Sequence, residues 1–202
     1  LWTPGNAVAQ RSERLGLAFD SQVVRAQYQE MIAAYEEAGV NVYQIPAEAG
    51  LPYQVYARDS SVMTPWGAII MQMEKPYRRG EYAAVLRFYL EHGIPIYDIV
   101  SAGNVEGGDF MVLKPGVAIC GYSGERSIEP AVNQLKNWFE AEGWEFMTYA
   151  FDPHFLHLDV QMGMIAEDLA VVCGEAVEPG LVDWLKSKQI RIMEISYGDT
   201  MN

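Results

Sequence analysis

The sequence predicts an α/β protein built from repeated strand–strand–helix–strand units. Charged and polar clusters recur at nearly even spacing: Arg58-Asp59, then Glu106-Gly107-Gly108-Asp109, then His157-Leu158-Asp159. Each cluster falls at a strand-like segment that is followed by a second apolar strand, a helix and another strand. An internal period of about fifty residues is typical of folds that repeat one supersecondary unit. We therefore expect polar groups from successive units to converge on one site.

The length and composition favour one globular domain with a sizeable core, with two small domains as the alternative. The chain has 202 residues, of which half are hydrophobic. Acidic residues outnumber basic residues by 27 to 14, for a net charge of -13. This balance argues against non-specific binding to nucleic acid or to an anionic membrane, and it is compatible with a cationic small substrate. The chain also lacks an apolar run of about eighteen residues, so we expect no membrane span.

The start of the chain and its cysteines indicate a cytoplasmic protein. The first residues lack the basic start and the apolar stretch of a secretory signal. Two cysteines cannot form a disulfide framework, which favours a reducing compartment. The chain has no initiator methionine, and this favours a processed or cut start.

The first part of the chain predicts an incomplete unit. Residues 1–20 are predicted to be irregular. Asp20 is suited to cap a helix over 21–38, where apolar residues recur at helical spacing before a glycine ends the helix. The segment 41–46 is predicted to form a strand. The region 1–46 is therefore expected to be the back half of a unit.

Three complete units are predicted to follow, over about 52–100, 104–151 and 154–196. Each unit is expected to contain two strands, a helix and a returning strand, in that order. In the first unit these elements are expected at 54–63, 68–73, 80–92 and 94–100. In the second they are expected at 110–113, 117–120, 129–142 and 145–151, and in the third at 155–164, 169–173, 181–188 and 190–196. Each unit has an apolar face that only a neighbour can cover, which a circular arrangement would do. We expect a single domain over 1–202 that lacks its last unit. The alternative is an ordinary open α/β domain with coincidental periodicity.

The third cluster offers an imidazole beside a carboxylate. In a strand, His157 and Asp159 would point to one face and His154 to the other. That separation disfavours a metal cluster, and the spacing is not that of a zinc protease helix. We expect no metal, although a metal-dependent hydrolase remains an alternative. His157 could also be a hydrogen-bonded core histidine.

The other clusters supply carboxylates for a cation. Two glycines between Glu106 and Asp109 let the backbone bend sharply or approach a ligand closely; the alternative is a turn with solvated acids. Arg58-Asp59 could be a surface ion pair, but its place in the repeat would bring Asp59 into the same central cavity. Several carboxylates there would suit a guanidinium, which offers five N–H donors in a planar fork.

Three further residues have side chains that could take part in chemistry. Arg126, in a loop before a helix, could clamp a substrate carboxylate or could be a solvated loop arginine. Cys120 and Cys173 follow small or β-branched apolar residues at strand positions. We expect both thiols to be buried and inert.

The ordered set of motifs resembles the guanidino-group modifying enzymes, which include arginine deiminase, dimethylarginine dimethylaminohydrolase and the amidinotransferases. The motifs are Arg58-Asp59, Glu106-Gly107-Gly108-Asp109, the segment from Gly121 to Ser127, and His157-Leu158-Asp159, and the resemblance covers about 21–202. It implies a pseudo-symmetric α/β propeller, five-bladed in the family, with about four blades present here. It implies no metal and no organic cofactor.

The resemblance also implies roles for single residues. A cysteine thiolate attacks the guanidinium carbon, and His157 carries protons to the leaving amine and from water or an acceptor amine. Glu106 orients the guanidinium and supports the histidine. Asp59 and Asp159 grip guanidinium nitrogens, and Arg126 holds the carboxylate of the substrate.

The sequence departs from the family pattern at the nucleophile. In the family the nucleophilic cysteine follows the fourth returning strand, and neither Cys120 nor Cys173 matches it. We therefore expect this chain to be a truncated form of a fuller enzyme and to have no normal turnover alone. The parent is expected to be a guanidino hydrolase. An amidinotransferase or a non-catalytic binding protein of the same fold is the alternative, and exposed edges could lead to a homo-oligomer.

Overall fold

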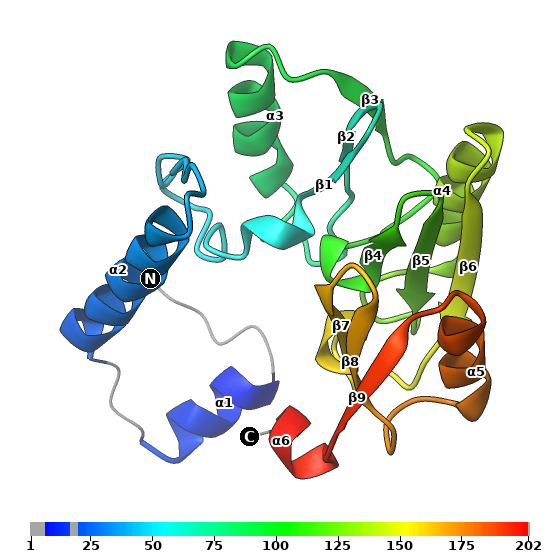
Figure 1. Cartoon of the computed structure of the whole chain (residues 1–202). Helices are drawn as coiled ribbons and strands as arrows, with labels where there is room; N and C mark the ends of the chain where they lie inside the picture. Colours follow the sequence, from blue (N-terminus) through cyan, green and yellow to red (C-terminus); the bar gives the residue numbers. More distant parts are fainter. Residues whose placement is uncertain (1–6, 17–19, 202) are drawn as a thin grey trace. The chain divides into compact units, whose positions relative to one another are not determined.

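The computed structural model describes residues 7–16 and 20–201. The chain divides into two compact units, Leu1–Pro52 and Tyr53–Asn202. In the first unit, the described elements are the helices α1 (Ala7–Arg14) and α2 (Ser21–Glu37). The second unit contains three small sheets with their helices (Figure 1). Whether the first unit joins the second in a single domain stays a prediction.

The first unit confirms one sequence prediction and overturns two. Asp20 caps α2 as predicted, because its carboxylate accepts hydrogen bonds from the backbone N–H groups of Gln22 (2.8 Å) and Val23 (3.3 Å). The prediction of irregular structure over 1–20 is wrong at α1, a helix of 8 residues that is too short to show a sustained helical period in the sequence. Residues 1–6 and 17–19 lie outside the described part. The predicted strand at 41–46 is not formed, since β-prone residues need a hydrogen-bonded partner.

The second unit repeats one strand–strand–helix–strand pattern three times, as predicted. Repeat 1 (61–99) contains β1 (Ser61–Thr64), β2 (Gly67–Ile70), α3 (Glu81–Glu91) and β3 (Ile96–Ile99). Repeat 2 (110–150) contains β4 (Phe110–Lys114), β5 (Val117–Tyr122), α4 (Glu129–Ala141) and β6 (Glu145–Ala150). Repeat 3 (162–195) contains β7 (Met162–Ala166), β8 (Leu169–Cys173), α5 (Pro179–Ser187) and β9 (Arg191–Ile195), and a short helix α6 (Tyr197–Met201) follows.

All three sheets have the same topology. The first and second strands pair antiparallel, and the second and third pair parallel through the helical crossover. The middle strand is always the second strand of its repeat. This agreement confirms that the period of about fifty residues reflects repeated structure. The five-bladed closure implied by the resemblance stays a prediction.

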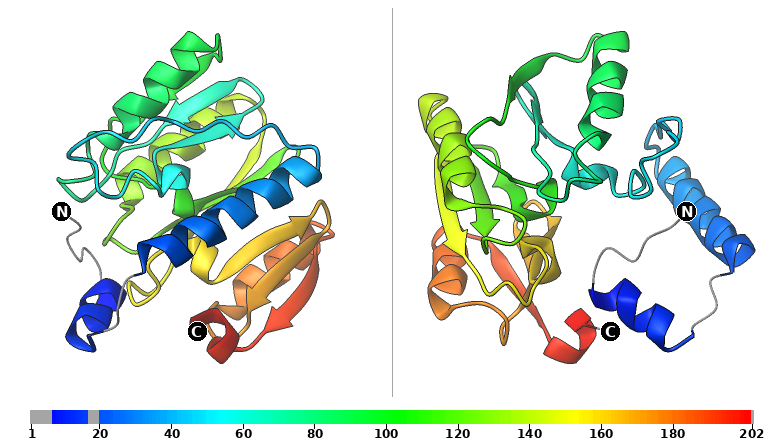
Figure 2. Two further views of the ribbon diagram at one scale, coloured as in Figure 1. Left: turned by 90° about the vertical axis from the view of Figure 1, so that its left-hand side faces the viewer. Right: turned by 180° about the vertical axis from the view of Figure 1, so that it is seen from behind.

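Two apolar cores join successive repeats, whose sheets and helices are drawn from two further sides in Figure 2. In the first, Val62 and Ile69 of repeat 1 share a cluster with Leu135 and Phe139 of α4. In the second, strand residues of repeat 2 share a cluster with residues of α5; they include Met111, Ile119, Leu181 and Leu185. Each of these cores contains residues of two repeats, so the apolar surface of one repeat is covered by the next. This shared burial fixes the position of one repeat against its neighbour.

A 3-10 turn precedes the first strand of each repeat: η1 (Ala57–Asp59), η2 (Gly107–Asp109) and η3 (Leu158–Val160). The strands predicted at 54–63 and 155–164 are therefore wrong in their first halves. His157 precedes η3 and Asp159 lies within it, so they do not alternate along a strand as expected. The turns form because their polar side chains bond the backbone of neighbouring turns in place of a strand ladder.

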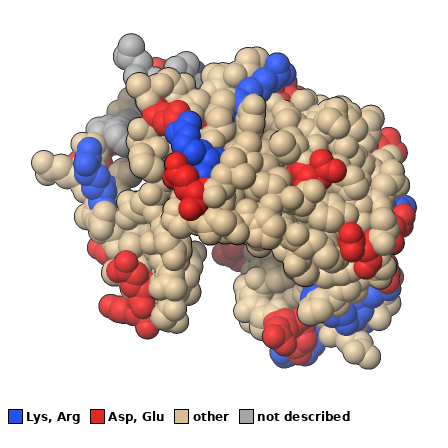
Figure 3. All heavy atoms as spheres, turned by 90° about the horizontal axis from the view of Figure 1, so that it is seen from above, with Lys and Arg blue, Asp and Glu red and all other residues tan. Residues whose placement is uncertain are grey.

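Two surface findings bear on the partner predictions. Among the described residues, no helix combines the length and the apolar character that a bilayer crossing requires. On the face drawn in Figure 3, the basic side chains lie in small separate groups with acidic side chains close to several of them. A broad basic surface of the kind that nucleic acid requires is not seen on this face.

Candidate functional site

The three turns bring together an imidazole and three carboxylates. His157 is 6% exposed. Its Nε2 atom lies 3.5 Å from Glu106 Oε2 and 3.8 Å from Asp59 Oδ1. Its Nδ1 atom lies 3.2 Å from Asp109 Oδ2. The structure thus places three of the residues singled out by sequence (Asp59, Glu106 and His157) in one buried cluster, although they come from successive turns.

Backbone hydrogen bonds between neighbouring turns hold this arrangement. The Gly108 N–H donates to Asp59 Oδ1 over 3.1 Å, and the Leu158 N–H donates to Asp109 Oδ1 over 2.9 Å. An acid at the end of one turn therefore anchors the next turn along the chain. The close approach requires glycine, because a Cβ at Gly107 would overlap the carbonyl oxygen of Arg58.

Arg78 is a buried member of the cluster that sequence reasoning missed. Its Nη1 atom donates to Asp59 Oδ2 over 2.9 Å and lies 3.6 Å from Glu106 Oε2. Its Nε and Nη2 atoms donate to the carboxylate of Glu81, at 3.1 and 2.8 Å. Burial by itself lowers the pKa of Arg78, but Glu81 and Asp59 outweigh burial and raise it. A signal was present in the sequence, since Arg78 and Glu81 stand three residues apart at a helix start.

Arg126 pairs with Glu106 within the cluster. Arg126 Nη1 donates to Glu106 Oε2 over 3.0 Å, and both side chains are buried. The other oxygen of Glu106 accepts the Glu74 N–H over 3.1 Å. Burial raises the pKa of Glu106, and the charge of Arg126 opposes that rise. Arg126 is therefore not a solvated loop residue, while its part in holding a substrate carboxylate stays a prediction.

Asp159 lies at the edge of the cluster. Its Oδ2 atom accepts a hydrogen bond from Arg58 Nε over 3.0 Å, and its side chain is about one-third exposed (33%). The surface ion pair that the adjacent Arg58 and Asp59 could form is not present, because Asp59 accepts a hydrogen bond from Arg78 instead. The role of Asp159 in gripping a guanidinium stays a prediction.

The environment of His157 favours its protonated form. Burial lowers the pKa of His157, but contact with Asp109 and the charges of Asp109, Asp59 and Glu106 outweigh burial and raise it. An imidazolium with a raised pKa can serve as a proton donor near neutral pH.

The buried charges leave the cluster negative. Four carboxylates (Asp59, Glu81, Glu106 and Asp109) and two arginines (Arg78 and Arg126) are buried here. When all four carboxylates are ionised and His157 is neutral, four negative charges meet two positive charges. With His157 protonated, one negative charge remains in excess. A cluster of this charge attracts a cation.

Within the described part of the chain, Asp59, Glu106 and His157 also form a cluster of side chains that could bind a metal ion. Their ligand atoms lie within 4.8 Å of one another. However, Arg78 and Arg126 already place positive charge against the two carboxylates, which opposes a metal cation at the same oxygens. The expectation that no metal is required stays a prediction.

Neither cysteine lies in a setting that would favour a nucleophile. As predicted, Cys120 and Cys173 are both buried. Burial raises the pKa of the Cys120 thiol well above its usual range. The thiolate is the nucleophilic form, and burial disfavours it.

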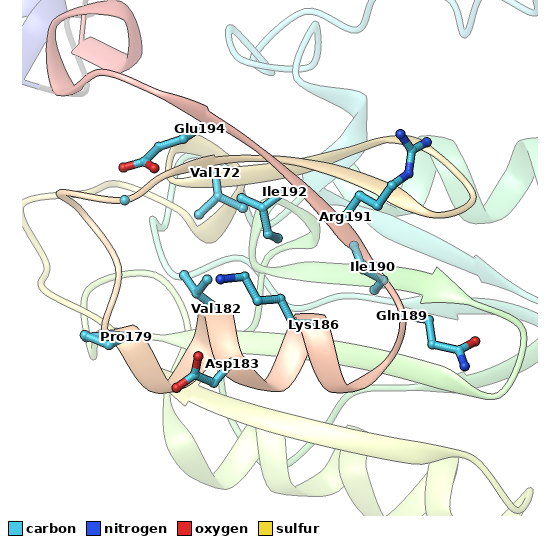
Figure 4. Close-up of a pocket in the computed structure, with 11 residues that line it drawn as sticks. Val172, Pro179, Val182, Asp183, Lys186, Gln189, Ile190, Arg191, Ile192 and Glu194 are labelled. Carbon is cyan, nitrogen blue, oxygen red and sulfur yellow. The ribbon is translucent and has the colours of Figure 1, made fainter.

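A separate cavity lies between α5 and β9 (Figure 4). Its volume is about 820 Å³, and it is lined by apolar side chains and by charges of both signs, Asp183 and Lys186 from α5 and Arg191 and Glu194 from β9. Arg191 is already paired with Asp168. None of the lining residues belongs to the His157 cluster.

Three solved structures share the fold of this chain. One is a dimethylarginine dimethylaminohydrolase of Pseudomonas aeruginosa in complex with citrulline, with a TM-score of 0.76 and 22% identity, covering 90% of this chain and 68% of that chain. Another is the N-terminal domain of ArgZ, a cyanobacterial arginine dihydrolase bound to its substrate, with a TM-score of 0.75 and 17% identity, covering 88% of this chain and 65% of that chain. Unliganded AgrE has a TM-score of 0.78 and 18% identity, covering 91% of this chain and 27% of that chain.

Sequence comparison gives two relatives and a family. The uncharacterised protein YkgA of Bacillus subtilis is 28% identical over 169 residues, which are 84% of this chain and 57% of YkgA. An uncharacterised protein of Aeropyrum pernix is 28% identical over 128 residues, which are 62% of this chain and 47% of that protein. The chain thus spans about half the length of these relatives. Residues 4–201 match the family described as N,N dimethylarginine dimethylhydrolase, eukaryotic, and the chain therefore belongs to this family.

Proposed function

We propose that the protein acts on the guanidino group of arginine or of an arginine derivative, as a hydrolase that forms a covalent amidino-cysteine intermediate. The observation that carries the proposal is the buried cluster of Asp59, Glu106 and His157, which combines excess negative charge with an imidazole of raised pKa. The family to which the chain belongs supports the same chemistry.

The acids would bind the planar guanidinium of the substrate. Asp59 and Glu106 already accept hydrogen bonds from guanidinium groups of the protein, those of Arg78 and Arg126. Ionised carboxylates bond guanidinium N–H groups strongly and in fixed directions. A substrate guanidinium would share or displace these contacts of Arg78 and Arg126 on binding to the same carboxylates, with Asp159 as a further ligand from the edge of the cluster.

His157 would move the protons. A thiolate attacks the guanidinium carbon and forms a carbon–sulfur bond. The carbon–nitrogen bond to the leaving amine then breaks, and His157 gives that amine a proton. Water attacks the amidino intermediate and gives a proton to His157. The carbon–sulfur bond breaks, which restores the thiolate and releases a ureido product.

The thiolate in this proposal comes from outside these 202 residues, because Cys120 and Cys173 are buried. We therefore expect the 202-residue chain to bind guanidino compounds without converting them. An amidinotransferase would use the same cluster and the same intermediate, with an amine in place of water. A binding protein of the same fold would retain the ligand affinity alone.

Calorimetric titration of the purified chain tests the proposal. L-arginine, dimethyl-L-arginine and agmatine are titrated beside citrulline, which is neutral at the ureido group. We expect the guanidino compounds to bind more tightly than citrulline, and Asp59→Asn to weaken their binding, whereas Asp98→Asn, at an exposed position, should not. Agmatine lacks a carboxylate, so a difference from arginine would measure the contribution of Arg126 to binding of that group. A folded chain that binds none of these compounds would exclude the proposal.

A product assay separates the remaining alternatives. We expect no citrulline from arginine with the chain alone. Robust citrulline formation would show that the nucleophile lies within these residues. In a longer form of the protein, transfer of the amidino group to added glycine would identify a transferase, and a ureido product would identify a hydrolase.

A further inference from the structure

Asp109 is the carboxylate nearest to the imidazole, and it is fully buried (0% exposed). Its Oδ1 atom accepts the Leu158 N–H over 2.9 Å. Its Oδ2 atom accepts the Ser127 hydroxyl over 2.5 Å and lies 3.2 Å from His157 Nδ1. These three partners lie beside the candidate site: Leu158 in η3, His157 directly before η3, and Ser127 in the loop before α4.

The contact with Asp109 distinguishes the two nitrogens of the ring. A neutral imidazole carries one N–H, on either nitrogen. A proton on Nδ1 would face Asp109, and the lone pair of Nε2 would then face Glu106 and Asp59. The Nδ1 contact is not aligned as an ideal hydrogen bond, so its strength comes mainly from the charge of the carboxylate.

Ser127 links the contact between Asp109 and His157 to Glu106, the other candidate for a catalytic role. Its Oγ atom donates to Asp109 and accepts the backbone N–H of Glu106 over 3.1 Å. Ser127 is fully buried, so this link is shielded from water. One hydroxyl thus fixes both the carboxylate that faces Nδ1 and the backbone that carries Glu106.

We propose that Asp109, held by Ser127 and by the Leu158 N–H, is a positioning residue that keeps the proton of neutral His157 on Nδ1 and so directs Nε2 toward the reacting atoms. The tautomer follows from contacts within this chain. Only its use in catalysis rests on the proposed function. The charged groups closest to the ring are Asp109 at Nδ1 and Glu106 and Asp59 at Nε2. Asp159, from the turn that follows His157, also interacts electrostatically with the ring and is paired with Arg58.

Nitrogen-detected NMR of the histidine rings tests the proposal on the 202-residue chain. The chain has three histidines, so the resonances of His157 can be assigned with a His157→Gln variant. In the wild type above the pKa of His157, we expect the proton on Nδ1. In Asp109→Asn, which keeps the size of the side chain but removes its charge, we expect the pKa of His157 to fall by about one unit. Asp98→Asn, on the exposed side of β3, should leave that pKa unchanged.

The outcomes separate this proposal from the proposed function. A proton on Nε2 of neutral His157 in the wild type overturns the proposed role of Asp109, and that measurement does not depend on the folding of a variant. A folded Asp109→Asn chain with an unchanged tautomer and pKa overturns it as well. Absence of arginine binding would exclude the proposed function alone, because the tautomer is read without ligand. A loss of stability in Asp109→Asn without a change at His157 would assign Asp109 a structural role only.

Discussion

Gly108 and His157 approach so closely that a Cβ atom at Gly108 would lie 2.8 Å from Cγ of the imidazole. The same atom would lie 3.1 Å from Asp59 Oδ1. Real Cβ atoms are almost never this close to a ring carbon, so one side chain must move. The second glycine of the Glu106–Asp109 segment therefore matters because the backbone approaches the candidate site and not because of its φ angle.

Gly108→Ala should displace His157 or Asp59 and weaken binding of arginine. The displacement breaks at least one charge-assisted hydrogen bond, worth about 1.5–3 kcal/mol, so affinity should fall about tenfold or more. Gly163→Ala is the matched control, since a Cβ there meets no atom within 4 Å. Titration calorimetry of both variants checks the prediction, and equal affinities would contradict it.

Arg126→Gln should destabilise the fold. Removal of the guanidinium leaves Glu106, a buried carboxylate, without its nearest cation. Breaking such a buried pair should lower the free energy of unfolding by about 3 kcal/mol, as measured by urea denaturation. In Arg191→Gln the broken pair with Asp168 is exposed, so its midpoint should stay close to that of the wild type. Equal losses of unfolding free energy in the two variants would show that the buried pair stabilises the fold no more than the exposed pair does.

The stability supplied by His157 should depend on pH in a defined direction. Its pKa is raised above the usual 6.5 in the folded chain, so the folded state binds the proton more tightly than the unfolded state. The contribution is therefore fully present below about pH 6.5 and is lost as pH rises through the raised pKa. The difference in unfolding free energy between wild type and His157→Gln should shrink over that window. A difference that grows with pH would reverse the sign of the proposed electrostatics.

The two thiols should be unreactive in the native chain. Cys120 and Cys173 are both buried, and burial raises the pKa of the Cys120 thiol. A chromogenic disulfide reagent should modify neither cysteine in buffer and both in concentrated urea. Rapid modification of one native thiol, with protection by arginine, would place a nucleophile within these residues.

The repeat itself could be predicted because it depends on local patterns. The strand at Leu169–Cys173 was predicted with the observed limits, and α4 was predicted one residue too long. Apolar periodicity and turn residues act over a few positions, so they can be read along the chain. The strands predicted over 54–63 and 155–164 began too early because a 3-10 turn with long-range partners stands at each start. Asp59 of η1 accepts the Gly108 N–H, and the Leu158 N–H of η3 donates to Asp109.

The sequence by itself determined the repeated α/β pattern and the candidates Asp59, Glu106 and His157. Only the tertiary structure decided their partners: Arg78 beside Asp59, Arg126 against Glu106, and Asp109 facing the imidazole. The physical reason is that an ion pair depends on the distance between side chains. In this fold that distance is set by the path of the chain within one unit for Arg78 and Arg126, and by the packing of one unit against the next for Asp109 and His157.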